Sequence, residues 1–239
     1  EKCGPNLKCT INGVKALKWA GFDCVTLLHN HFYDYGEVGV NDTLKALQNE
    51  DIDYAGGGLN SKDASKTLYK EVNGNKLAII NCCEREFSIA TEKSAGSNPL
   101  NVIQQYYMIK EAKNNAKYVI VIVHGGVELF WLPSPRMKET YRFFIDAGAD
   151  VVINHHQHCF SGYELYNNKP IFYGLGNFCF DGNRENVNWS TGYIVGLTFN
   201  DDEIDFQLFP YRQCYKEHTG IHFLSNEDLT AFLNCINQY

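Results

Sequence analysis

The chain of 239 residues is 44% hydrophobic, which fits one fairly large domain, so we predict a single domain over residues 1–239. A formal net charge of -7 and the absence of any basic run argue against a nucleic-acid partner, because phosphate contacts need clustered Lys and Arg. No apolar stretch approaches the roughly 18 to 20 residues of a membrane helix, and no signal-like segment opens the chain, so we expect a soluble chain.

Short apolar runs alternate with helical patterns through the first two thirds of the chain. Strands are predicted at 22–28, 66–72, 76–83, 118–123 and 151–153, and helices at 12–19, 37–49, 99–115 and 135–147. Asn73-Gly74-Asn75 predicts a hairpin turn, and Gly148 ends the fourth helix. This order indicates an α/β fold.

From residue 163 onward the pattern changes to antiparallel hairpins. Strands are predicted at 163–166 and 170–173 around Asn167-Asn168, then at 192–199 and 204–210, with a final helix at 227–236. Two sheets packed together with helices outside fit this order better than a barrel does.

Nine cysteines are an odd number for a disulfide framework, and several lie within apolar runs where buried thiols are common. We therefore predict a reduced chain. No C-x-x-C pair is present to support a structural zinc site.

Polar, metal-competent side chains follow three of the predicted strands, at the edge where open α/β sheets bind ligands. Six of the eight histidines lie in these places, which are 29–34, 124–128 and 154–158. On an extended backbone residues two apart face the same side, so His156 and His158 can bind one ion while His155 faces away. A structural histidine cluster is the alternative interpretation.

Two further segments offer candidates. Glu84 follows the strand at 76–83, although Glu84, Arg85 and Glu86 together are also typical of a surface ion-pair group. Asn177 and Asp181 lie in a glycine-containing segment that suits either a close approach to a ligand or a tight turn.

Three parts of the chain, the last in two pieces, together resemble a known family. Residues 21–36 (GFDCVTLLHNHFYDYG) are similar to G-F-D-x-V-x-L-A-N-N-H-x-x-D-Y-G, and 124–128 (HGGVE) are similar to H-W-G-x-E. Residues 146–158 (DAGADVVINHHQH) and 173–178 (YGLGNF) are similar to D-A-G-A-D-x-V-I-G-H-H-P-H and Y-S-L-G-N-F. The chain thus resembles, over roughly residues 10 to 200, the bacterial poly-γ-glutamate capsule-synthesis proteins (CapA or PGA_cap type), a branch of the calcineurin-like metallophosphoesterases.

The resemblance implies a four-layer α/β/β/α sandwich around two divalent metal ions, with Mn, Zn or Fe as the candidates. Such cations, about 3.5 to 4 Å apart, polarise a phosphoryl group and acidify a water. By resemblance the metal ligands are Asn30, His124, His156 and His158. His31 would act as general acid or hold an oxygen anion, with Asn30 and Asp34 as catalytic neighbours. The remaining site candidates are His29, His155, Glu128, Glu84 and Asn177.

Departures from the family pattern include His29 in place of Asn, Gly125 in place of Trp and Asn154 in place of Gly. The family's first strand, with a G-D motif and a following N-x-E, would lie upstream of Glu1. We therefore expect a sandwich that lacks its first strand, with a gap in one sheet, and a metal site without its acidic ligands.

The resulting prediction is a capsule biosynthesis protein with a dinuclear-metal, hydrolase-like site. The alternatives are a non-catalytic polymer-binding or assembly scaffold, and a phosphoesterase that acts on a small phosphate ester. An anionic polymer or phosphate-containing substrate and capsule-synthesis membrane proteins are the expected partners. The resemblance favours the cell envelope, whereas nine cysteines favour the cytoplasm. If the protein is active, we expect a metal-dependent, phosphoesterase-like hydrolase.

Overall fold

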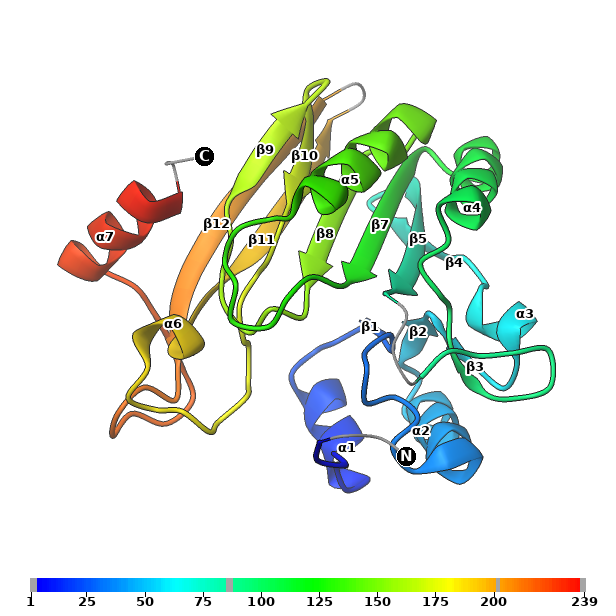
Figure 1. Cartoon of the computed structure of the whole chain (residues 1–239), viewed down its shortest axis with the longest axis horizontal. Helices are drawn as coiled ribbons and strands as arrows, with labels where there is room; N and C mark the ends of the chain where they lie inside the picture. Colours follow the sequence, from blue (N-terminus) through cyan, green and yellow to red (C-terminus); the bar gives the residue numbers. More distant parts are fainter. Residues whose placement is uncertain (1–3, 85–87, 201–202, 237–239) are drawn as a thin grey trace. The chain divides into compact units, whose positions relative to one another are not determined.

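The computed structural model describes residues 4–84, 88–200 and 203–236 (Figure 1). Its internal contacts divide the chain into two compact units. The first unit comprises Glu1–His124 and Ala147–Ala149, and the second comprises Gly125–Asp146 and Asp150–Tyr239. Within the described ranges, no helix has both the length and the apolar character needed to cross a bilayer.

The first unit is built around a mixed sheet in which β5 (Asn75–Cys83) pairs antiparallel with β4 (Leu68–Val72) and parallel with β7 (Tyr118–His124). A separate parallel pair joins β1 (Cys24–Thr26) to β2 (Asp53–Ala55), and an antiparallel pair joins β3 (Gly57–Gly58) to β6 (Gly96–Ser97). The helices of this unit are α1 (Asn12–Trp19), α2 (Gly36–Asn49), α3 (Ser61–Ala64) and α4 (Val102–Asn115).

Local sequence explains the β4–β5 hairpin. Asn73 and Gly74 have φ angles of 51° and 76°, which suit a two-residue turn whose twist matches that of the strands. The turn fixes the register, with Val72 opposite Asn75. In the separate parallel pairing of β5 with β7, Cys83 at the end of β5 is the register partner of His124, the last residue of β7.

The core of the first unit anchors the loop that follows β1. Val40, Leu44 and Leu47 recur at helical spacing on the buried face of α2. They belong to one apolar cluster with Leu27 and Phe32, which are each 7% exposed and flank the polar residues 29–31. Burying both ends of this short segment restricts the positions that its polar side chains can take.

The second unit contains two sheets. In one, β10 (Lys169–Phe172) pairs parallel with β8 (Val151–His155) and antiparallel with β9 (Tyr163–Tyr166). In the other, β12 (Glu203–Gln213) pairs antiparallel with β11 (Thr191–Asn200) and with β13 (Ile221–Phe223). Helices α5 (Pro135–Ala147), α6 (Val187–Ser190) and α7 (Asn226–Ile236) complete the elements (Figure 1).

Aromatic side chains join the two sheets of the second unit. The ring of Phe172 in β10 lies 5.1 Å from that of Phe206 in β12 and 6.5 Å from that of Tyr193 in β11. Tyr163 in β9 also meets Phe206 edge to face, with ring centroids 5.0 Å apart. These contacts confirm, within this unit, the predicted packing of two sheets.

The predicted α/β class is confirmed, and mixed sheets with flanking helices are present. The helices at 12–19 and 135–147 have the predicted bounds, whereas the strand predicted at 22–28 is confined to Cys24–Thr26. The short elements α3, α6, β2, β3, β6 and β13 were not predicted, because runs of two to four residues carry little periodicity. The single-domain assignment, the four-layer arrangement and the missing first strand stay predictions.

Candidate functional site

The residues predicted to form a site are distributed over both units, and each group is described within its own unit. In the first unit, Asn30 Oδ1 lies 3.3 Å from His124 Nε2, although 94 positions separate the two residues in the chain. The His29 ring lies 6.2 Å from the His124 ring in an edge-to-face arrangement. The structure therefore brings the loop after β1 together with the end of β7, as the sequence predicted.

His31 is paired with the carboxylate of Asp34 in the same loop. Its Nδ1 lies 2.8 Å from Asp34 Oδ2, and the Asp34 side chain is only 2% exposed. A carboxylate can only accept, so the His31 ring carries a proton on Nδ1 and presents Nε2 outward from this contact. The same carboxylate oxygen accepts the backbone N–H of Leu7 at 2.7 Å. Asp34 therefore sets the orientation of the His31 ring.

Two buried residues that the sequence analysis did not single out hold this loop in place. Ser88 Oγ donates to the backbone carbonyl of Asn30 at 2.9 Å. Asn81 accepts the Leu28 backbone N–H at 3.2 Å and donates to the Ile122 carbonyl at 2.9 Å, which links the start of the loop to β7. Both residues are 2% exposed, and their hydrogen bonds fix the position of the loop backbone. A polar Asn81 within an otherwise apolar strand was the feature of the sequence that could have indicated this role.

Glu84 follows β5 next to His124. Its backbone N–H donates to the His124 carbonyl oxygen at 3.0 Å, so the residue begins beside the candidate ligand. A ligand role for its carboxylate stays a prediction. Arg85 and Glu86, which formed the predicted trio with Glu84, lie outside the described residues.

In the second unit, the expected extended backbone through the histidine cluster is wrong. Strand β8 ends at His155, and His156 and His158 have positive φ angles of 124° and 59°. The chain turns here, and a turn rather than strand alternation brings the rings of His156 and His158 to 6.2 Å. His155 contributes its carbonyl oxygen, which accepts the Gly125 backbone N–H at 2.9 Å.

A buried polar network fixes this turn. Asn154 Nδ2 lies within 3.0 Å of three oxygens, namely Gln157 Oε1 and the carbonyls of Gly125 and Tyr173. The Tyr141 hydroxyl donates to Asn154 Oδ1 at 2.7 Å, and Gln157 Nε2 donates to the Tyr173 carbonyl at 2.9 Å. Asn154 and Gln157 are 0% and 1% exposed. The buried Gln157 side chain therefore fixes the turn between His156 and His158.

Of the two remaining candidates, Asn177 is buried and contacts the histidine turn, whereas Glu128 is exposed. Asn177 is 6% exposed, and its Oδ1 lies 2.8 Å from His158 Nδ1. Glu128 is exposed in the loop after β7, between Val127 and Leu129, whose backbone N–H donates to the Gln157 carbonyl at 2.7 Å. The structure thus joins Asn177 to His158, and a site role for Glu128 stays a prediction.

The donor types in each unit suit a divalent transition metal, because neutral imidazole and amide oxygen are ligands for Mn, Zn and Fe. Within the first unit these donors are Asn30 and His124, and within the second they are His156 and His158. Within the described parts of the chain, no group of three or more His, Cys, Asp or Glu side chains is gathered closely enough to hold an ion.

The thiol of Cys159 lies next to His158 in the sequence. Burial raises the pKa of this thiol to about 11, so it stays protonated at neutral pH.

A mixed α/β chain with histidines and asparagines at the ends of buried strands defines the general class, and comparison with known proteins gives the family. Residues 1–182 match the family described as bacterial capsule synthesis protein PGA_cap. The chain therefore belongs to the PGA_cap family of bacterial capsule synthesis proteins, which confirms the resemblance found in its motifs.

Two relatives support this assignment. The chain is 40% identical over 174 residues to the capsule biosynthesis protein CapA of Bacillus anthracis, a match that covers 70% of this chain and 42% of that protein. It is 36% identical over 180 residues to the PGA biosynthesis protein CapA of Bacillus subtilis (strain 168), which covers 74% and 47% respectively. The matches span less than half the length of these relatives.

The fold is similar to that of a hypothetical protein from Thermus thermophilus, known from a crystal structure. The two share 16% sequence identity with a TM-score of 0.56, and the match covers 84% of this chain and 81% of the other. This likeness supports the fold alone.

Proposed function

We propose that this chain works in the biosynthesis of a capsule polymer such as poly-γ-glutamate through a metal-dependent, metallophosphoesterase-like hydrolytic site. The convergence of Asn30 Oδ1 and His124 Nε2 at 3.3 Å, beside an imidazole oriented by Asp34, is the observation that carries the proposal. The relatives named capsule biosynthesis protein CapA and PGA biosynthesis protein CapA support the biological setting.

Asn30 and His124 are the proposed metal-holding residues of the first unit. Divalent cations, when bound, polarise a phosphoryl or similar group and lower the pKa of a water. The Ser88 and Asn81 contacts keep the loop that carries Asn30 in one position relative to β7, which reduces the reorganisation needed on binding.

His31 is the proposed proton donor or anion-holding group. The Asp34 carboxylate engages Nδ1, which leaves Nε2 as the nitrogen that would give a proton to a leaving oxygen or donate to a developing oxygen anion. The carboxylate also stabilises the positive charge of a protonated imidazole. Asp34 thus acts on the reaction through His31.

His156 and His158 are the proposed ligands of the second unit. Both project from a turn whose intervening residue, Gln157, is buried and bonded to the Tyr173 carbonyl. A turn held in this way keeps two imidazoles near each other without dependence on strand geometry.

Metal analysis of single variants tests the proposal. We expect His124→Ala and His156→Ala each to lower the bound Mn, Zn or Fe at least about ten-fold, since each removes a direct ligand. The matched control is His222→Ala, because His222 is an exposed histidine of the second unit whose Nε2 contacts the Thr219 carbonyl at 2.9 Å. Metal content that survives both ligand changes would overturn the proposed site.

The same variants separate the alternatives when they are placed in capsule-producing cells. Loss of capsule together with loss of metal supports the hydrolase-like function. Capsule production that survives in metal-free variants supports the assembly scaffold instead. Turnover of small phosphate esters that disappears in His124→Ala, while the capsule is unchanged, supports the phosphoesterase.

A further inference from the structure

The ring of His158 is held by a hydrogen bond to Asn177 and by contacts with two aromatic rings. Its Nδ1 lies 2.8 Å from Asn177 Oδ1, while Asn177 Nδ2 donates to the carbonyl oxygens of His158 at 3.1 Å and Trp189 at 3.0 Å. Reversing the amide would turn its oxygen toward two carbonyl oxygens, so these acceptors fix its orientation. The amide oxygen then faces His158, and Nδ1 must be the donor.

A protonated Nδ1 has a direct chemical consequence. In a neutral imidazole only one nitrogen carries hydrogen, so Nε2 of His158 retains its lone pair. That nitrogen is the atom able to bind a metal or accept a hydrogen bond. Partners of this kind commonly set the tautomer of histidine ligands.

Two aromatic rings restrict the same imidazole. The centroid of His158 lies 5.3 Å from that of Phe180 and 5.0 Å from that of Trp189, at interplanar angles of 26° and 22°. Phe180 and Trp189 are themselves 5.2 Å apart. The three rings therefore form a triangle, and His158 cannot rotate far without losing contact with both neighbours.

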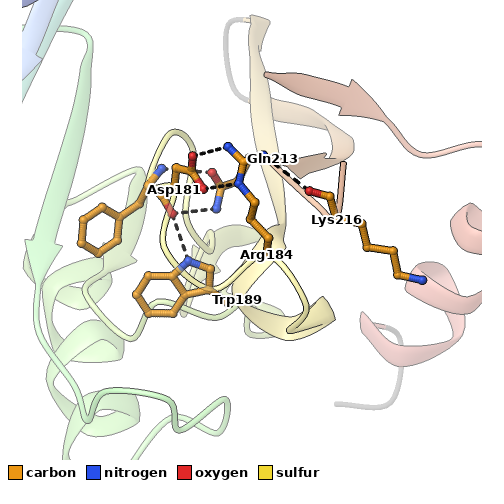
Figure 2. Close-up of polar contacts among 6 residues, drawn as sticks. Asp181, Arg184, Trp189, Gln213 and Lys216 are labelled. Carbon is orange, nitrogen blue, oxygen red and sulfur yellow. Dashed lines mark hydrogen bonds and ion pairs between the residues drawn. The ribbon is translucent and has the colours of Figure 1, made fainter. Parts of the chain in front are cut away.

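The aromatic triangle is in turn tied to β12. The Trp189 indole N–H and Gln213 Nε2 both donate to the Phe180 carbonyl, at 2.9 Å and 3.0 Å, while Gln213 Oε1 accepts the Phe180 backbone N–H at 3.1 Å (Figure 2). Gln213 is 1% exposed, and its buried amide supplies hydrogen-bond partners for both the N–H and the carbonyl of Phe180.

An ion pair closes the loop on the same side. Arg184 bonds to the carboxylate of Asp181 through two nitrogens and donates from a third to the Lys216 carbonyl, as the dashed lines in Figure 2 indicate. The pair is exposed and contributes little by itself. It does connect the loop at 181–184 to the segment after β12.

We infer that Trp189 and Gln213 are positioning residues that, with Asn177, lock His158 in the Nδ1–H tautomer and present Nε2 as its binding atom. Trp189 and Gln213 lie beyond residue 182, where the match to the family ends. The segment after the family match therefore belongs functionally to the histidine turn. The identity of the ligand at Nε2 rests on the proposed function, whereas the locked tautomer does not.

The tautomer can be measured in metal-free protein by two-bond ¹H–¹⁵N correlation NMR of the histidine rings at about pH 8, where histidine is ordinarily neutral. The His158→Gln variant assigns the ring by loss of its signals. We expect a single Nδ1–H pattern for His158. A single Nε2–H pattern, or a mixture of both, overturns the inference.

Variants test the positioning role. Gln213→Ala and Trp189→Ala are expected to give a mixed tautomer pattern and a metal affinity about ten-fold weaker. Gln207→Ala is the matched control, an exposed glutamine on the same strand, and should change neither quantity. If Gln213→Ala fails to fold, Trp189→Phe serves in its place, since it keeps a stacked ring and loses only the indole hydrogen bond.

These outcomes separate the two proposals. A protein that binds no metal yet shows the Nδ1–H tautomer, released in the variants, contradicts the proposed function and supports the positioning role. Wild-type tautomer and affinity in both Gln213→Ala and Trp189→Ala overturn the positioning role, whatever the metal content.

Discussion

The loop after β1 and the turn after β8 both present histidines directly after a buried strand, yet they orient them differently. In the first, the partner of His31 is the carboxylate of Asp34, at 2.8 Å. In the second, the partner of His158 is the neutral amide of Asn177, also at 2.8 Å. A carboxylate stabilises a charged imidazole, and an amide oxygen does so much less. Under the proposed function, this difference suits His31 for proton transfer and His158 for ligation.

The two regions also differ in what supports them. The first loop is held by apolar anchors at both ends, Leu27 and Phe32. Ser88 donates one hydrogen bond to it, and Asn81 accepts one from it. The second turn rests on a buried amide network centred on Asn154. We therefore expect the second region to respond more strongly to loss of one polar side chain.

The largest effect is expected from Asn154→Leu. This change removes the acceptor of the Tyr141 hydroxyl and the donor to the Gly125 carbonyl and to Gln157 Oε1, and should lower the free energy of unfolding by about 4 kcal/mol. Urea denaturation measures the loss. Asn188→Ala, at an exposed asparagine of the same unit, is the control and should cost no more than about 0.5 kcal/mol. Equal, small losses in the two variants would mean that the buried network is not the main support.

Gly56→Ala tests the support of the first region. Gly56 has a φ of +93°, and an added Cβ would lie 2.4 Å from both Asn81 Oδ1 and Leu28 Cγ, so we expect a loss of about 3 kcal/mol. Gly74→Ala separates backbone strain from crowding, because Gly74 has a φ of +76° and no heavy atom within 4 Å of the added Cβ. It should cost only about 1 kcal/mol, measured by the same denaturation. A similar cost at both glycines would contradict the role of crowding.

Asp34→Asn tests the contrast between carboxylate and amide directly. The variant gives His31 the type of partner that His158 has, and should reduce hydrolysis of a phosphate ester about 100-fold in kcat with little change in KM. Asp42→Asn on the exposed side of α2 is the control. An unchanged kcat in Asp34→Asn would remove His31 from the proposed proton transfer.

The smallest effect is expected from the ion pair behind the second turn. Arg142 donates to Glu164 through two nitrogens at 2.8 Å and 2.7 Å, and Tyr173 donates to it at 2.9 Å. The hydrogen bonds from Arg142 lower the Glu164 pKa, so the native state favours the charged carboxylate. The charged Glu164 carboxylate therefore stabilises the folded protein above its ordinary pKa of 4.5. This stabilisation is lost as the pH falls through the lowered pKa of the folded state.

Unfolding free energy measured from pH 7 downward checks this sign. Glu164→Gln should reduce stability at pH 7 by less than about 1 kcal/mol, since the pair is partly exposed, and should flatten the acid dependence. A variant that keeps the wild-type slope below pH 4.5 would assign that slope to other carboxylates.

Much of the fold was predictable because its signals are local. The Asn73-Gly74 turn requires positive φ angles that few residues adopt, and α5 runs without interruption from Pro135 to the stop before Gly148. Polar residues after two strands marked Asn30 and His124 as candidates, but the contact between them was not visible in the sequence, because β1 and β7 belong to separate sheets.

The features that could not be predicted from the sequence depend on tertiary contacts. No periodicity distinguishes His156 in a strand from His156 in a turn with a φ of 124°, because the turn is imposed by where Asn154 and Gln157 find partners. Gln213 gave no signal either, since its role depends on a loop more than thirty positions away in the chain. Polar residues inside an apolar strand were the only hint available.

The amide network under the second turn also explains how the departures from the family pattern fit together. The family pattern has Trp, Gly and Pro where this chain has Gly125, Asn154 and Gln157, and here Asn154 bonds to both of the others. A side chain added at the neighbouring Gly126 would lie 3.2 Å from Gln157. Residues 125, 154 and 157 are therefore coupled through Asn154, which donates to the Gly125 carbonyl and to Gln157 Oε1. In a chimera between relatives, residues 125, 154 and 157 should be transferred together.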